Sequence, residues 1–217
     1  ELGLLTRVLP ELEDSRGVQQ PKEHYWNVLD HSIETVAAME QVLRLAPGDK
    51  ARLDDIPWDE TMAEYFNEEI SEGRTRAVVA KIAALLHDVA KPATKSIESN
   101  GRIRFLGHPT KGAELSQRAL RRLRFSNREI KMVSGIVTEH LRPGLLTRTE
   151  EPPTRRAVYR FFRDAGDIAV DTLFLSFADM LAARGPLLED QEWRRYAGRI
   201  SGILQSSRER RPEVRPV

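Results

Sequence analysis

Apolar residues recur at helical spacing along most of this 217-residue sequence. Several of these runs end at a glycine or a proline, as at Gly166 and Gly185, and Ser126 stands where one run needs an N-cap. The predicted helical segments are 26–46, 81–92, 110–124, 126–143, 150–166 and 167–185. The pattern predicts an all-α helical bundle, and the length suits a single domain with a sizeable core.

Two segments depart from these long runs. Asn100-Gly101 lies between two short alternating stretches, and this dipeptide is the strongest short-range signal for a type I′ β-hairpin. We expect one small hairpin there and no other β-structure. The acidic segment 54–76 predicts a short surface helix. The charged, proline-containing residues 206–217 predict a flexible tail after a domain at 1–205, whose residues 1–22 form a lead-in helix or linker.

Composition narrows the possible partners. The chain has 34 Lys and Arg against 33 Asp and Glu, so it lacks the general basic field of non-specific nucleic-acid binders. It contains no cysteine, which leaves imidazole and carboxylate groups as the strong metal ligands. No apolar run approaches the ~20 residues of a membrane helix. We therefore expect a cytoplasmic protein with no membrane partner.

The stretch "KIAALLHDVAKP" sets His87 and Asp88 into the most apolar of the predicted helices. A buried, unpaired carboxylate is costly, so proteins neutralise it, pair it or use it to bind a metal. For this dipeptide alone, a hydrogen-bonded core pair that only fixes the packing is the better explanation. A metal site requires further ligands elsewhere in the chain.

Two residues on other predicted helices supply such ligands. His31 shares a helix face with Val28, Thr35 and Val42, and Asp179 interrupts the apolar run "TLFLSFADMLAA". A divalent ion would neutralise this set of buried imidazoles and carboxylates. Nitrogen and oxygen ligands suit Mn, Fe, Co, Ni, Zn or Mg.

Two more histidines fit the same pattern. His140 continues the apolar stripe of Val133 and Val137, and His108 follows the predicted hairpin at a loop-to-helix junction. Either of them alone would be explained as an ordinary core or loop histidine. Their joint occurrence with the other ligands favours a metal site.

The order His31, His87-Asp88, Asp179 resembles the H…HD…D signature of the HD-domain metal-dependent phosphohydrolases. The segments "GVQQPKEHYWNVLDHSIETV", "AALLHDVAKP", "RFLGHPTKGAE" and "LRRLRFSNREIKMVSGIVTEH" most resemble the HD region of the tRNA nucleotidyltransferase (CCA-adding) and poly(A) polymerase family. The chain shows no Gly-Ser strand followed by an Asp-x-Asp pair, which the nucleotidyltransferase head would need. It resembles the C-terminal HD part alone, which would account for its start at Glu1.

The resemblance implies a site for one or two divalent ions. His31, His87, Asp88 and Asp179 would hold the first ion. His108 and His140 match the additional histidines of the two-metal subgroup, in which Asp88 would bridge both ions. The sequence "GHP" departs from the more usual "GHE", which leaves the histidine intact and changes only the residue after it.

This site predicts a metal-dependent phosphohydrolase that acts on a nucleotide or another phosphate mono- or diester. Asp88 and Lys91 are the candidate catalytic residues. Lys91 follows Asp88 by three residues and would neutralise phosphate charge, or it merely complements the negative end of its helix. Arg142 and His24 are further candidates for substrate binding.

A second hypothesis is a helical module that binds RNA and positions it for a catalytic head. It rests on the basic stripe of the segment "RALRRLR", and such a stripe is also typical of an ordinary solvated face. The stripe consists of Arg118, Arg121, Arg122 and Arg124.

Overall fold

The computed structural model describes residues 3–149 and 151–208. This part of the chain is mainly helical, as predicted, with two small antiparallel strand pairs. The longer helices are α2 (Val28–Val42), α4 (Glu60–Asn67), α5 (Arg76–Leu86), α7 (His108–Arg122), α8 (Asn127–Glu139), α10 (Arg155–Ala165), α11 (Ala169–Arg184) and α12 (Asp190–Arg208). The shorter ones are α1 (Leu4–Val8), η1 (Pro10–Ser15), α3 (Lys50–Asp54), α6 (Lys91–Thr94), α9 (Leu141–Leu146), η2 (Gly166–Ile168) and η3 (Gly185–Leu187). The strands are β1 (Glu69–Ser71), β2 (Arg74–Thr75), β3 (Lys95–Ile97) and β4 (Ile103–Phe105).

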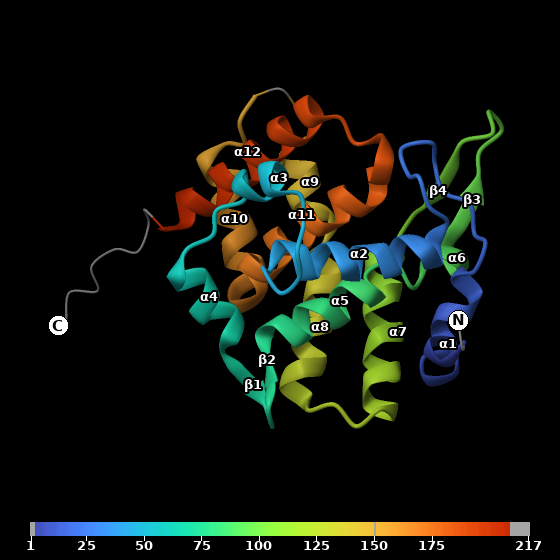
Figure 1. Ribbon diagram of the computed structural model, residues 1–217. Helices are drawn as coiled ribbons and strands as arrows, with labels where there is room; N and C mark the ends of the chain where they lie inside the picture. The colour runs from blue at the N-terminus through green and yellow to red at the C-terminus, as the bar shows by residue number, and fades with distance from the viewer. Residues whose placement is uncertain (1–2, 150, 209–217) are drawn as a thin grey trace.

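The helix α5 lies at the centre of the bundle. It packs against α2 and α8, while α2 also packs along α11 and α8 along α7 (Figure 1). Val79, Ala80, Ala83 and Leu86 of α5 are completely buried, and the small alanines allow neighbouring helices to approach closely. The residues that follow α5 therefore enter the interior of the molecule. Within the described ranges, no helix combines the length and the apolar character needed to cross a membrane.

The predicted helix boundaries with specific caps are confirmed. Ser126 caps α8 in a capping box: Glu129 N donates to its hydroxyl, and the Glu129 carboxylate accepts from Ser126 N. Gly166 and Gly185 end α10 and α11 at φ of 56° and 49°, in the left-handed half of conformational space that glycine tolerates best.

The predicted hairpin is present, but its turn is not type I′. In the β3–β4 pair, Ile97 lies opposite Ile103. Gly101 has φ of 80°, whereas Asn100 is not among the residues with positive φ, and a type I′ turn requires both. Gly101 N donates to Glu98 O in a three-residue loop. The Asn100 side chain accepts a hydrogen bond from Arg102 N, which stabilises this three-residue loop.

The prediction of a single hairpin is wrong, because β1 and β2 form a second one. Within the segment 54–76, α4 ends at Asn67 and β1 starts two residues later. Glu72 and Gly73 join the strands, both at positive φ. Strands of three and two residues are too short to show an alternating pattern, so no local signal predicts them.

The helix α12 was also not predicted. Its inward face is apolar at helical spacing, with Trp193, Ala197, Ile200 and Leu204 all buried. The helix reaches Arg208, so the first three residues of the predicted tail are helical. The remainder of that tail, 209–217, lies outside the described residues.

Candidate metal centre

The pair His87-Asp88 lies in a turn, whereas the sequence predicts a continuous helix over 81–92. The helix α5 ends at Leu86, and His87 is its C-cap. Pro92 has no N–H to donate to the Asp88 carbonyl four residues earlier. That carbonyl accepts from Lys91 N instead, at 2.9 Å, which closes a tight turn. Both side chains of the pair are buried inside the bundle.

The first predicted ligand set converges. His31 Nε2 lies 3.2 Å from His87 Nε2, 3.4 Å from Asp88 Oδ2 and 3.1 Å from Asp179 Oδ1. His87 Nε2 lies 3.1 Å from Asp88 Oδ2 and 3.7 Å from Asp179 Oδ1. Ligands that hold a zinc-like ion at about 2.0–2.2 Å stand roughly 3.0–3.5 Å from one another. These separations fit a single coordination sphere.

The second predicted set faces the other oxygen of the same carboxylate. Asp88 Oδ1 lies 3.3 Å from His108 Nε2 and 3.7 Å from His140 Nε2. The two Nε2 atoms are 3.3 Å apart. Asp88, His108 and His140 thus form a second buried group that is close enough to hold an ion. Asp88 is positioned between the two sets, with one oxygen toward each, as a bridging carboxylate would be.

Hydrogen bonds to backbone carbonyl oxygens fix which ring nitrogen carries the proton in three of these histidines. Nδ1 of His87, His108 and His140 lies 2.7 Å from the carbonyl oxygen of the residue three positions earlier. A carbonyl only accepts, so Nδ1 carries a proton. In the neutral ring Nε2 then has a free lone pair, which is the tautomer that binds metal ions. In contrast, the buried Nδ1 of His31 has no hydrogen-bond partner.

Because these ionisable groups lie close together, they shift one another's pKa values. Burial alone would raise the pKa of Asp88, but His87 and Lys91 hold that pKa well below its usual range. Burial likewise opposes ionisation of Asp179, and His31 and His87 keep its pKa well below the usual range. Two neighbouring carboxylates therefore stay ionised within this cluster of imidazoles.

The pKa values of two of the histidines shift in opposite directions. Burial would lower the pKa of His87, but Asp88 and Asp179 raise it to about 10. Burial and the neighbouring His87 lower the pKa of His140 to about 3. The donor set, its burial and its net negative charge fit a divalent ion held by imidazole and carboxylate groups.

Lys91 completes the centre. Its Nζ donates to Asp88 Oδ2 and to Gln20 Oε1, both at 2.6 Å, and lies 5.5 Å from the centre of the Phe105 ring. Gln20 is itself held by a hydrogen bond from its Nε2 to Trp26 O. Gln20 is not among the sequence candidates, although it lies in the segment 17–36 that resembles the HD family and also contains His31.

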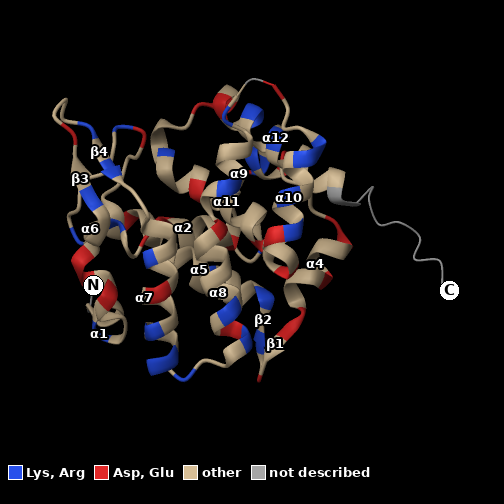
Figure 2. Ribbon diagram, turned by 180° about the vertical axis from the view of Figure 1, so that it is seen from behind, with Lys and Arg blue, Asp and Glu red and all other residues tan. Residues whose placement is uncertain are grey.

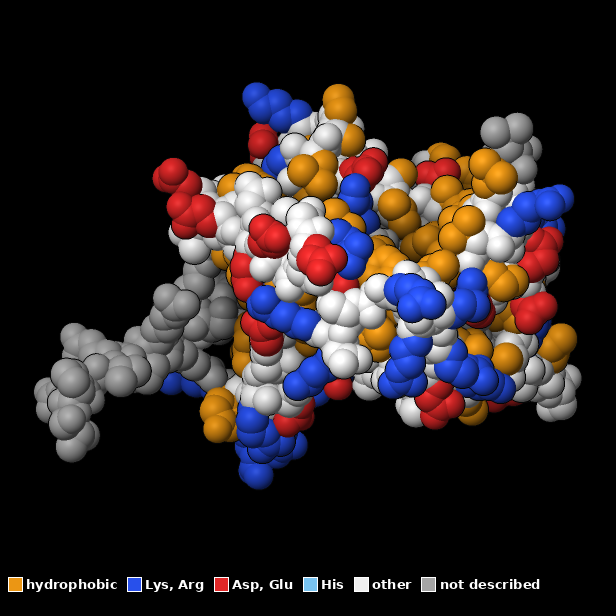
Figure 3. Space-filling view, turned by 90° about the horizontal axis from the view of Figure 1, so that it is seen from below, with side chains coloured by type: hydrophobic (Ala, Val, Ile, Leu, Met, Phe, Trp, Pro, Cys, Tyr) orange, Lys and Arg blue, Asp and Glu red, His pale blue; other side chains and the backbone are white. Residues whose placement is uncertain are grey.

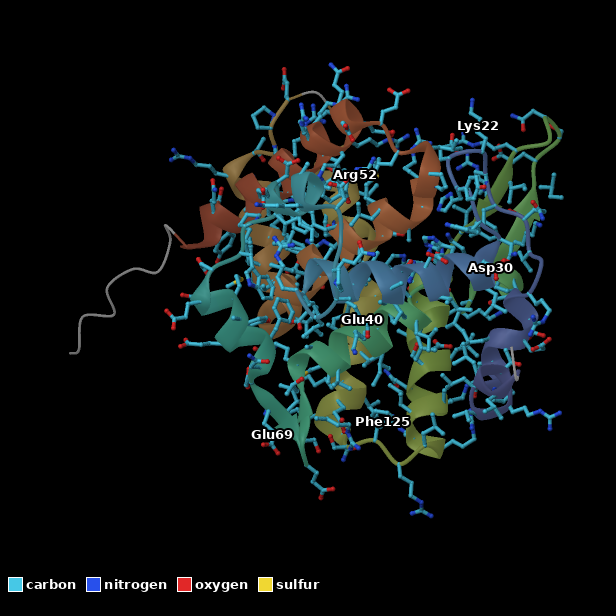
Figure 4. The ribbon with its side chains drawn as sticks, in the orientation of Figure 1. Lys22, Asp30, Glu40, Arg52, Glu69 and Phe125 are labelled. Carbon is cyan, nitrogen blue, oxygen red and sulfur yellow. The ribbon has the colours of Figure 1, made fainter. Side chains whose placement is uncertain are left out.

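A cavity of about 510 Å³ opens beside these groups. Its lining includes Asp88, Lys91, His108, His140 and Asp179. It lies between the segment 21–24, the β3–β4 hairpin and the second half of α11. Figure 4 marks the start of α2, which carries His31, with the neighbouring residue Asp30.

Of the two further substrate-binding candidates, only His24 lines the cavity. The His24 ring contacts His31 edge to face, and burial lowers the pKa of His24 to about 4. Arg142 is not part of the lining. Its guanidinium pairs with Glu139 at 2.7 Å and Asp164 at 3.2 Å, so it is held away from the candidate centre.

Comparisons with known proteins agree with this geometry. The HD domain family model matches residues 28–184, a range that contains all six candidate ligands. The chain is 32% identical over 212 residues to a CC-adding tRNA nucleotidyltransferase of Thermus thermophilus, covering 97% of this chain and 40% of the relative. It is 31% identical over 186 residues to an A-adding tRNA nucleotidyltransferase of Deinococcus radiodurans, covering 85% of this chain and 34% of the relative. The chain thus spans less than half the length of either relative. With the signature residues converging in one helical bundle, the chain belongs to the HD-domain family.

Proposed function

We propose that this chain is a metal-dependent phosphohydrolase that acts on a nucleotide or another phosphate mono- or diester. One observation carries the proposal: two ligand sets meet on the two oxygens of the buried Asp88 carboxylate, beside an open cavity. A merely structural domain gains nothing from such a cluster, because burying several ionisable groups together costs free energy.

The six ligands would divide into two groups. His31, His87 and Asp179 would hold one divalent ion with Asp88, and the remaining two histidines, His108 and His140, would hold a second. A bound divalent ion supplies Lewis acidity, which polarises a phosphoryl oxygen and makes water more acidic. The two carboxylates would keep the ions in place through their negative charge.

Lys91 would bind the phosphate. Its ammonium has three hydrogens, of which Asp88 and Gln20 accept two. The third is free to donate to a phosphate oxygen in the cavity. His24 would border the bound ester, since it lines the same cavity.

The test begins with metal analysis of the purified protein, followed by a screen of phosphate monoesters, diesters and cyclic diesters with Mn²⁺, Co²⁺, Ni²⁺, Zn²⁺ and Mg²⁺. We expect about one or two ions per chain and hydrolysis that depends on them. A protein that binds none of these ions, or that hydrolyses no ester when loaded, would refute the proposal.

A second candidate function is RNA binding, and the surface of α7 favours it. Lys and Arg recur along α7, with the acidic Glu114 between Lys111 and Arg118 (Figure 2), and basic side chains gather on the face seen from below (Figure 3). Arg118, Arg121 and Arg124 are exposed, whereas Arg122 pairs with Glu11 at 2.8 Å. The two relatives named above act on tRNA by their names, which makes RNA a reasonable partner to test.

This candidate is tested by anisotropy titrations with a fluorescent RNA hairpin at several salt concentrations. Replacing Arg118, Arg121 and Arg124 with alanine would weaken binding and reduce the slope of log K against log salt by about 0.7–0.9 for each phosphate that these arginines neutralise. Arg156→Ala with Arg160→Ala, on the exposed face of α10, is the control. Equal losses of affinity in both variants would indicate only a non-specific charge effect.

A further inference from the structure

His31 differs from the other three candidate ligand histidines in how its Nδ1 atom is held. In each of those three, Nδ1 donates to a backbone carbonyl oxygen. Nδ1 of His31 is buried and has no hydrogen-bond partner, and the whole residue is inaccessible to bulk water. A buried polar atom without a partner costs free energy, and folded proteins normally provide a partner for it. The surroundings of His31 should therefore supply one.

The ring of His24 lies against the ring of His31 and carries a second unpaired nitrogen. The two ring centres are 5.4 Å apart, and the rings meet edge to face at 83°. Nδ1 of His24 is buried and also has no hydrogen-bond partner. One bridging water can satisfy two unpaired polar atoms on neighbouring rings, and His24 borders the cavity from which a water can enter.

The backbone around His24 is held in place. His24 N donates to Pro21 O at 2.9 Å, and Tyr25 N donates to Ala183 O at 2.8 Å. Ala183 belongs to α11, the helix that also carries Asp179. The His24 ring is therefore anchored to the same helix as one of the candidate ligands, and it is a fixed partner for another.

The place of the ring proton decides which nitrogen of His31 can bind an ion. When Nε2 gives its lone pair to an ion, Nδ1 carries the proton and needs an acceptor. In a neutral imidazole one nitrogen donates and the other accepts, so Nδ1 of His24 can be that acceptor. An outer partner of this kind fixes the tautomer and the orientation of a ligand histidine, which strengthens metal binding.

We propose that His24 is a positioning residue for the candidate metal centre. Its Nδ1 accepts, through one bridging water, the hydrogen bond from Nδ1–H of His31, and this aims Nε2 of His31 at the first ion. The inference rests on the metal centre of the proposed function, but it concerns ion binding and does not require hydrolysis.

The test compares two replacements of the same shape. Asparagine and leucine branch alike at Cγ, but only asparagine keeps a hydrogen-bonding atom near the place of Nδ1. By calorimetry, His24→Leu should raise the dissociation constant of one bound Mn²⁺ about ten- to a hundred-fold. His24→Asn should stay within about three-fold of the wild type. Equal weakening in both variants would indicate a packing role alone and would overturn the inference.

Lys22→Ala is the matched control. Lys22, which Figure 4 labels, lies in the same segment as His24, is exposed and does not line the cavity. This variant should bind Mn²⁺ as the wild type does. A loss of affinity as large as that of His24→Leu would mean that any change in the segment disturbs the centre, which contradicts a specific role for His24.

NMR of the Zn²⁺-loaded protein with isotope-labelled histidine observes the hydrogen bond itself. The Nδ1–H proton of His31 should give a signal at the same position in the wild type and in His24→Asn. In His24→Leu the signal should move upfield, because a proton without an acceptor is less deshielded. An unchanged position in His24→Leu would refute the inference.

The same measurements separate this inference from the proposed function. A protein that binds ions but hydrolyses no ester loses the proposed function, while weaker Mn²⁺ binding in His24→Leu than in His24→Asn still supports the role of His24. A wild type that binds neither Mn²⁺ nor Zn²⁺ would overturn both.

Discussion

At the scale of single residues, two buried carboxylates in this molecule have opposite surroundings. Asp88 faces the imidazoles of His87 and His108, whose Nε2 atoms lie 3.1 Å and 3.3 Å from its oxygens. Asp171 accepts from Arg76 at 3.0 Å and from the Tyr65 hydroxyl at 2.6 Å, and both Asp171 and Arg76 are buried. Asp88 belongs to the candidate centre, where Lys91 also pairs with it at 2.6 Å, whereas Asp171 pairs with Arg76 away from that centre.

Replacement of Asp88 should therefore affect metal binding more than folding. We expect Asp88→Asn to remove most of the bound metal and all hydrolysis, because one negative charge shared by both ligand sets is lost. The helical circular dichroism spectrum should remain. The measurement is metal content per folded protein together with the rate of ester hydrolysis. Full metal content in this variant would contradict the assignment of Asp88.

Replacement of Asp171 should do the reverse. Asp171→Asn removes the buried carboxylate from the partners of the Arg76 guanidinium, which keeps Glu68 at 2.7 Å and Asp167 at 3.3 Å, so the free energy of unfolding should fall by about 1–3 kcal/mol. The folded fraction should still bind metal normally. Urea unfolding followed by metal analysis at low temperature checks both statements. A stability loss equal to that of Asp88→Asn would show that the two carboxylates do not differ as described.

At the scale of elements, Glu129 joins the β1–β2 hairpin to the start of α8. Its buried carboxylate caps α8 together with Ser126 and pairs with Arg74, whose guanidinium lies over the Phe125 ring. Figure 4 shows Glu69 and Phe125 at this end of the molecule. Burial would raise the pKa of Glu129, but Arg74 and Ser126 lower it.

This junction should give stability a definite pH dependence. A carboxylate whose pKa is lowered by folding stabilises the protein above its unfolded pKa of about 4.3 and loses that contribution as pH falls through its folded pKa. Glu129→Gln should cost about 2 kcal/mol at pH 7 and less below pH 4. Urea unfolding of the wild type and the variant, from below pH 4 to pH 7, measures this difference in the free energy of unfolding. Glu114→Gln, on the exposed face of α7, should change stability by less than about 0.5 kcal/mol.

At the scale of the whole molecule, the candidate centre connects helices that are distant in sequence. His31 comes from α2, His87 and Asp88 from the turn after α5, His140 from the end of α8, and Asp179 from α11. An ion held by these groups would cross-link the bundle at its core, so folding and metal binding should be coupled.

Chelation should accordingly lower the thermal stability of the wild type. Metal at 100 times its dissociation constant adds about 2.7 kcal/mol, which corresponds to a Tm shift of roughly 5–10 °C for a domain of this size. The measurement is Tm by calorimetry with and without EDTA. Asp88→Asn should show almost no shift. A wild-type Tm that is indifferent to EDTA would mean that metal binding and folding are not coupled.

The sequence by itself determined the helical class, the caps at Ser126 and Gly166, and the place of the β3–β4 hairpin. These features depend on interactions between residues within a few positions of one another, so a local pattern is enough to predict them. The convergence of the six candidate ligands was also predicted, from ionisable residues in apolar or junction contexts and from the resemblance to the HD-domain family. The short β1–β2 hairpin carried no such pattern and was missed.

Only the tertiary structure decided how these groups face one another. The division of the two Asp88 oxygens between His31 and His108, and the hydrogen bond from Lys91 to Gln20, depend on how separate helices and loops pack. The same packing holds Arg142 on its ion pairs outside the cavity, although it follows His140 by two residues. Sequence spacing places a residue on a helix face, whereas the direction of its side chain is fixed by contacts with residues far away in the chain.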